Sequence, residues 1–130
     1  MAAVLLTPSF ASARQSGVML EEVVGTWINP QGTVKVQTAA CGQNLCGWVV
    51  WASGEAIADA RDSGVGRLVG TELLRDYRDI GGHRYAGKVY VPDIGRSFAS
   101  TIKQVDANRL TIRGCILGGL ICKSQDWRRA

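Results

Sequence analysis

The stretch GCILGGLIC, residues 114–122, carries two cysteines placed symmetrically about a pair of glycines. A Gly-Gly pair accepts the positive φ angles that the tight turns of two-residue β-hairpins require. A turn at 118–119 sets Cys115 opposite Cys122, with Cα atoms about 4.5–5.5 Å apart, a separation that a disulfide can span. The stretch therefore predicts two antiparallel strands joined by a disulfide.

A second close pair of cysteines lies in CGQNLCGW, residues 41–48. Neither pair has the two-residue gap of zinc knuckles or of thioredoxin-like redox motifs, so we expect no metal site. We predict local disulfides Cys41–Cys46 and Cys115–Cys122, the first closing a hairpin loop at 42–45. Long-range pairing is the alternative, because chain entropy favours it, at about 4–4.5 kcal/mol against 2–2.5 for a short loop.

Short alternating or apolar segments, separated by turn signals, follow one another along the chain from residue 23. This regular spacing is typical of an all-β sandwich or barrel. Residues 53–69 lack the alternation and are predicted to form a long loop with one helical turn. We expect turns at 29–32, 79–82, 92–95 and 106–108, and strands at 23–28, 33–38, 46–52, 73–77, 83–91, 97–102, 110–113 and 123–129.

About eight sequential strands can stack as a sandwich or close into a barrel, and closure removes exposed sheet edges. Gly25-x-Trp27 on the first strand and Trp127-x-Arg129 on the last indicate a seam, in which arginine stacks on a tryptophan face. The alternative is that the tryptophans only fill the core. We predict an all-β fold: a single small antiparallel β-barrel of about eight meandering strands, over residues 23–130.

Residues 1–13 begin with an apolar stretch and end in Ala11-Ser12-Ala13, a pattern that signal peptidase recognises. We expect the remnant of a signal peptide there and a flexible segment at 14–22; a frayed apolar tail is the alternative. No window is long enough for a transmembrane span. These features predict a periplasmic or secreted bacterial protein.

The net charge of +4 comes from scattered basic residues, which argues against a nucleic-acid partner.

Several short motifs occur in a fixed order along nearly all of residues 23–130. They are Gly25-x-Trp27, Cys41 with Leu45-Cys46-Gly47, Leu68-x-Gly70, Gly87 with Tyr90-x-Pro92-Asp93-x-Gly95, Leu110-x-x-Arg113-Gly114-Cys115 and Gln125-x-Trp127-x-Arg129. This ordered set resembles the bacterial secreted family known as domain of unknown function 2147. The resemblance implies a small exported β-barrel and no established activity. The Gly-x-Trp start and the closing arginine are also similar to lipocalin-like proteins, which bind small apolar ligands.

The chain carries no recognisable catalytic constellation. His83 is its single histidine, and no Gly-x-Ser-x-Gly elbow accompanies it. The segment Asp59–Gly64 lacks the ligand count of a calcium loop, and no phosphate-binding glycine loop is present. We therefore expect no enzymatic activity, no metal and no cofactor.

Aromatic side chains are the ligand-binding candidates, namely Trp48, Trp51, Tyr90 and Phe98. Because Trp48 and Trp51 are three residues apart on one strand, we expect them on opposite faces, with one inside the barrel. The first functional hypothesis is binding of a small apolar or amphipathic molecule. The alternative is an envelope interaction or structural module that uses the apolar hairpin tip at 116–121 and the loop at 53–69. Oligomeric state is not determined by these patterns.

Overall fold

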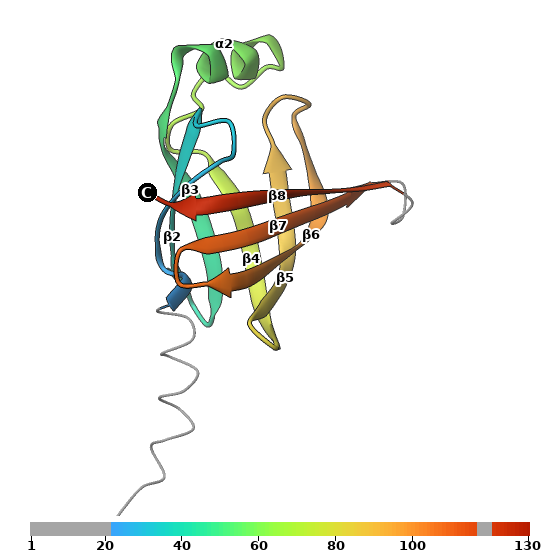
Figure 1. Ribbon diagram of the computed structural model, residues 1–130. Helices are drawn as coiled ribbons and strands as arrows, with labels where there is room; N and C mark the ends of the chain where they lie inside the picture. The colour runs from blue at the N-terminus through green and yellow to red at the C-terminus, as the bar shows by residue number, and fades with distance from the viewer. Residues whose placement is uncertain (1–21, 117–120) are drawn as a thin grey trace, which may run out of the picture.

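Eight antiparallel strands close into one barrel, in which each strand pairs with the next along the chain and the last pairs with the first (Figure 1). This computed structural model describes residues 22–116 and 121–130. The strands are β1 (Gly25–Ile28), β2 (Val34–Cys41), β3 (Asn44–Ala52), β4 (Glu72–Gly81), β5 (Arg84–Val91), β6 (Arg96–Asp106), β7 (Arg109–Ile116) and β8 (Ile121–Arg129). The predicted all-β barrel of eight meandering strands is confirmed. The expected leader at 1–13 and all but the last residue of the expected segment at 14–22 lie outside the described residues.

A nine-residue helix, α2 (Gly54–Asp62), interrupts the strands and lies at one end of the barrel (Figure 1). The prediction of a loop with one helical turn was therefore wrong in extent. The Ser53 side chain caps the helix by accepting a hydrogen bond from Ala56 N at 3.1 Å, and Glu55 occupies the first turn, where a negative charge is favourable. Ala60 is fully buried against the barrel, so tertiary packing stabilises a helix with only a weak amphipathic pattern.

Two hairpin turns are tighter than the sequence predicted. Cys41 pairs directly with Asn44, so the loop expected at 42–45 is a two-residue turn in which Gly42 has a φ of 66°. The turn expected at 79–82 lies instead at Gly82 and His83, whose φ angles are 64° and 59°. Two successive positive φ angles define the turn type that matches strand twist, and histidine tolerates this conformation better than most residues.

The barrel interior is filled at the end opposite α2. Side chains alternate along β6, where Ser100 and Ile102 are buried and Phe98 is partly buried, while the residues between them are exposed. Large side chains with almost no exposed surface form this packed half together with their neighbours: Val23, Trp27, Val36, Thr38, Leu45, Val49, Tyr77, Tyr85, Ile102 and Leu110. Such close packing leaves little space for a ligand among these side chains.

The seam between β1 and β8 closes the barrel, and Arg129 is its central residue. Its guanidinium lies 4.2 Å from the centre of the Trp27 ring, and Trp27 pairs with Arg129 in the strand register. Arg129 also donates hydrogen bonds to the carbonyls of Glu22, Val24 and Ala107 at 2.6, 3.1 and 2.9 Å. Trp27 is 1% exposed, so it fills the core as well as supporting the seam.

Gly25 makes room for this arginine. A Cβ atom at position 25 would lie 2.3 Å from Arg129 Nη1, and the φ of 152° at Gly25 is also one that other residues rarely adopt. Gly25 and Arg129 are therefore complementary parts of the same seam, which explains why the Gly-x-Trp start and the closing arginine occur together.

We predict that Arg129→Ala lowers the free energy of unfolding by about 2–3 kcal/mol, because three charge-assisted hydrogen bonds and one cation–π contact are lost. Arg129→Lys should recover only a minor part of this loss, since an ammonium cannot reproduce the fork of the guanidinium. Urea unfolding followed by tryptophan fluorescence measures both. Arg128→Ala, on an exposed neighbour in the same strand, is the control and should change stability by about 0.5 kcal/mol or less. Equal losses for Arg128→Ala and Arg129→Ala would contradict the assigned role of the seam.

Two buried tyrosines make the fold sensitive to high pH. Burial raises the pKa of Tyr77 well above its ordinary value, partly offset by the Ser100 hydroxyl. Burial, with the nearby charges of Asp79 and Glu22, raises the pKa of Tyr85 to about 12. Neither Tyr77 Oη nor Ser100 Oγ has a hydrogen-bond partner of normal geometry among the described residues.

We therefore predict that stability is constant up to the ordinary tyrosine pKa of about 10 and falls as pH rises further. Above that pH the unfolded chain releases phenolic protons that the folded chain retains, so unfolding becomes favoured. Tyr77→Phe should make the decline shallower while leaving stability at neutral pH nearly unchanged, because its hydroxyl has no hydrogen bond of normal geometry among the described residues. Urea unfolding at a series of pH values tests this. A decline of the same slope in Tyr77→Phe would contradict it.

Candidate ligand cavity

A cavity of about 830 Å³ occupies the half of the barrel next to α2 and opens at that end. Its walls come from the inward faces of β2, β4, β5, β6, β7 and β8, and its mouth from α2 and the turns between β1 and β2 and between β5 and β6. The apolar residues that line it are Val34, Ala56, Leu68, Leu73, Leu74, Val89, Val91, Pro92, Ile94, Phe98, Ile112, Ile121 and Trp127. The interior is thus half packed and half hollow.

Small residues and strand alternation create this space. Gly114 lines the cavity directly opposite Ser100 in the β6–β7 register, and its missing side chain leaves the volume that a larger residue would occupy. On β8 the residues that line the cavity alternate with outward ones and include two polar side chains, Gln125 and Lys123, between Trp127 and Ile121. The floor is therefore apolar, and polar groups concentrate at the opening, as in sites that bind small molecules.

Carboxylates are prominent at the mouth. Glu55 and Asp59 lie one helical turn apart and line the cavity from α2, while Asp93 lines it from the β5–β6 turn. Ser63, at the C-terminal cap of α2, donates a hydrogen bond to the backbone carbonyl of Asp93. This bond links the helix to the turn, so the three carboxylates belong to one connected part of the rim.

The four aromatic candidates separate into two groups. Phe98 and Tyr90 line the cavity, and Arg75 lies 4.7 Å from the centre of the Tyr90 ring. Trp48 and Trp51 do not line it, and the expectation that they face opposite sides of the barrel was wrong. They pair with Gln37 and Lys35, which are two residues apart on β2 and so share a face.

A β-bulge is the reason for this error. Val36 pairs with Val49, whereas Lys35 pairs with Trp51, so Val50 is an extra residue that shifts the alternation. Both tryptophans consequently lie on the outer surface, where Trp51 is 42% exposed and has the ammonium of Lys35 at 5.3 Å from its ring centre. Sequence periodicity carried no signal for the bulge.

Sequence reasoning also missed most of the cavity wall. Leu73, Leu74 and Ile112 fall in predicted strands that carry no predicted binding role. Glu55 and Asp59 fall in the predicted loop at 53–69. The alternation of β7 and β8 could have placed Gly114 and Gln125 on the inner face. The acidic residues of α2 could have been found only by recognising the helix and its position over the barrel end.

The two predicted disulfides are present, Cys41–Cys46 with Cα atoms 5.8 Å apart and Cys115–Cys122 with Cα atoms 4.1 Å apart. Cys115 and Cys122 face each other directly, as the hairpin prediction required. Cys41 and Cys46 are instead diagonal neighbours, since Cys46 pairs with Ala39. Two disulfides indicate an oxidising location outside the cytoplasm.

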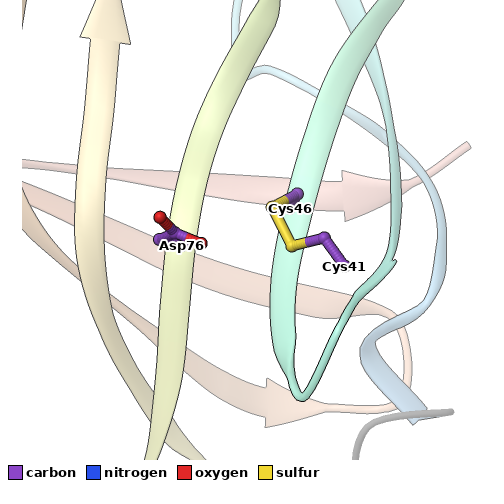
Figure 2. Close-up of side chains that lie close together, drawn as sticks. All are labelled: Cys41, Cys46 and Asp76. Carbon is purple, nitrogen blue, oxygen red and sulfur yellow. A yellow bond between two sulfur atoms is a disulfide. The ribbon is translucent and has the colours of Figure 1, made fainter.

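The sulfur atoms of Cys41 and Cys46 and a carboxylate oxygen of Asp76 lie within 4.8 Å of one another (Figure 2). Asp76 has a φ of 51° at a bulge in β4, and this conformation directs its side chain toward the disulfide. Both sulfurs are bonded to each other, so they are not thiolate ligands in this state. The cluster therefore offers a metal ion one exposed carboxylate, and its cysteines act as structural cross-links.

The structure also locates His83 and part of the hairpin tip at 116–121. His83 is exposed in the β4–β5 turn. Of the hairpin tip at 116–121, residues 117–120 lie outside the described residues, and Ile121 is 46% exposed and lines the cavity. Within the described part of the chain, no helix has the length and apolar character needed to cross a bilayer.

A family model described as "Uncharacterized protein conserved in bacteria (DUF2147)" matches residues 25–129. The chain belongs to this family. Among solved structures, it is similar to protein HP1028 from the human pathogen Helicobacter pylori, which is described as belonging to the lipocalin family. The TM-score is 0.63 at 14% identity, over 83% of this chain and 82% of that one, so the likeness concerns the fold. No curated protein matches the chain. The resemblances to DUF2147 and to lipocalin-like barrels are thus confirmed.

Removing either disulfide should lower stability without changing the fold. The chain-entropy relation gives about 2–2.5 kcal/mol for each of these short loops, so Cys41→Ser/Cys46→Ser and Cys115→Ser/Cys122→Ser should lose similar amounts. Urea unfolding of the two double variants measures the losses. Peptide mapping of the unreduced wild-type protein is the control and should recover both local cross-links; peptides joining residue 41 or 46 to residue 115 or 122 would contradict the assignment.

Proposed function

We propose that this protein binds a small apolar or amphipathic molecule in the barrel cavity and does so without catalysis. The observation that carries the proposal is the cavity itself, whose volume of about 830 Å³ lies within the range typical of small-molecule sites. Eight-stranded barrels of this size hold one small ligand, and the lipocalin-like fold is consistent with such use. The apolar floor would contact the body of the ligand, and the rim its polar end.

We further propose that binding takes place in the bacterial periplasm. The family is bacterial, and the two disulfides indicate an oxidising location. A carrier or sensor of a poorly soluble molecule in that compartment would have to shield the molecule from water. A buried apolar chamber provides this shielding.

An envelope interaction module is the alternative proposal. It is supported by Val50, Trp51 and Val69, which are 48%, 42% and 41% exposed. Val69 lies beside this end of β3, because Gly70 N donates a hydrogen bond to Val49 O at 2.7 Å. Exposed apolar side chains at the end of β3 and of the 53–69 segment are of the kind that partner proteins cover. The 116–121 tip would be the second contact in this alternative.

Gly114→Leu tests the cavity proposal. A Cβ at position 114 would lie 3.4 Å from Val89 Cγ1, so a leucine there extends into the cavity without a backbone clash. We predict that the wild-type protein binds the neutral fluorescent probe N-phenyl-1-naphthylamine and that Gly114→Leu weakens this binding by about 10-fold or more. Fluorescence titration measures the dissociation constant.

Ala99→Leu is the matched control, because Ala99 is exposed on the outer face of the adjacent strand β6. It adds the same side chain outside the barrel and should leave probe binding unchanged. Thermal unfolding of both variants verifies that they are folded. Absence of probe binding to the wild-type protein, or equal binding by the wild-type protein and a folded Gly114→Leu variant, would overturn the proposal and leave the interaction module as the better account.

A further inference from the structure

The rim of the cavity contains polar amides that are already engaged within the protein. The Asn29 side chain accepts hydrogen bonds from the backbone N–H groups of Thr33 and Val34 and donates to Gln31 and Thr33. The Gln125 side chain accepts a hydrogen bond from Trp127 Nε1 at 3.0 Å. These amides support the wall and the β1–β2 turn, which leaves the charged side chains of the rim as its main polar groups toward a ligand.

Those charged side chains are mostly negative. Glu55, Asp59 and Asp93 carry three negative charges, and Lys123 carries one positive charge, which gives the rim a net charge of −2. None of the four side chains is in an ion pair with another described residue. The chain as a whole carries +4, so the sign of the rim is opposite to that of the protein. Charge at the mouth of an apolar chamber with low-dielectric walls attracts groups of the opposite sign.

The rigid attachment of α2 keeps two of these carboxylates at the mouth. Ala60 is the buried residue of the helix, and Ser53 caps its start. Ser63 donates a hydrogen bond to the backbone carbonyl of Asp93 in the β5–β6 turn. Glu55 lies in the first turn, where its charge offsets the partial positive charge of the helix terminus. The partial positive charge of the helix terminus, about +0.5, is smaller than the net charge of the rim, so the rim remains negative.

From this arrangement we propose the class of ligand: an amphipathic molecule with an apolar body and a cationic head, such as a protonated amine. The inference rests on the proposed function, because it concerns the same cavity. The apolar body lies against the wall formed by Phe98 and Ile112, and the cation lies among Glu55, Asp59 and Asp93. An anionic head of the same size would face a net repulsion, relieved only by Lys123.

The test compares decylamine, 1-decanol and decanoate, which share one chain length and differ in head-group charge at neutral pH. Each displaces N-phenyl-1-naphthylamine from the wild-type protein in fluorescence competition. We expect decylamine to bind about 3- to 10-fold more tightly than 1-decanol, as solvent-exposed ion pairs of this kind allow, and decanoate to bind more weakly than 1-decanol. High salt should reduce the advantage of the amine, because exposed charges are screened.

The variant Glu55→Gln/Asp59→Asn/Asp93→Asn should lose the preference for decylamine while keeping its affinity for 1-decanol. The matched control is Asp79→Asn/Asp106→Asn/Asp126→Asn, which removes the same overall charge at positions that do not line the cavity. It should retain the preference. Circular dichroism and thermal unfolding establish that both variants are folded.

The outcomes separate the two proposals. If the probe does not bind, or if it binds and none of the three alkyl compounds displaces it, the proposed function fails. If 1-decanol binds but decylamine binds no more tightly, the ligand class is wrong while the cavity proposal stands. The same conclusion follows if the preference for decylamine persists in the rim variant or disappears equally in the control.

Discussion

The contact between Arg129 and Trp27 is the constraint on which the rest of this structure depends. It joins the first strand to the last, and Gly25 leaves the space that the guanidinium requires. Once the barrel is closed, every strand has two neighbours and the inner residues are removed from water. The same arginine binds the carbonyls of Glu22 and Val24, which holds the start of the described chain against the packed end of the barrel.

The two ends of the closed barrel differ in how their interiors are filled. Large side chains such as Tyr77, Tyr85 and Ile102 fill the interior at the end away from α2. Toward α2, Gly114 and the polar residues of β8 replace them, and a chamber remains. The two disulfides lie in hairpins and contribute rigidity rather than reactivity. The four cysteines, which first suggest a reactive site, do not line the cavity.

Much of the fold could be predicted because the relevant signals are local. Alternation on β6 and the Gly-Gly pair between Cys115 and Cys122 each reflect short-range geometry. The residues of the cavity were harder to predict from the sequence. Tyr90 and Phe98 do line the cavity, but Trp48 and Trp51 lie outside because a bulge at Val50 changes the parity of β3. A bulge depends on the pairing of two strands, so the sequence of one strand does not reveal it.

The sequence by itself determined the all-β class, the eight strands and the local disulfides, because hydrogen-bonding period, turn conformation and cysteine spacing act over a few residues. The terminal Trp and Arg motifs indicated the seam, but the contact between Trp27 and Arg129 joins residues that are distant in the chain. Only the tertiary structure decided that the barrel is half hollow and that α2 brings Glu55 and Asp59 to its mouth. Cavity volume depends on how side chains from six strands meet across the interior, and rim charge depends on where a helix packs. Both are properties of residues that are distant in the chain.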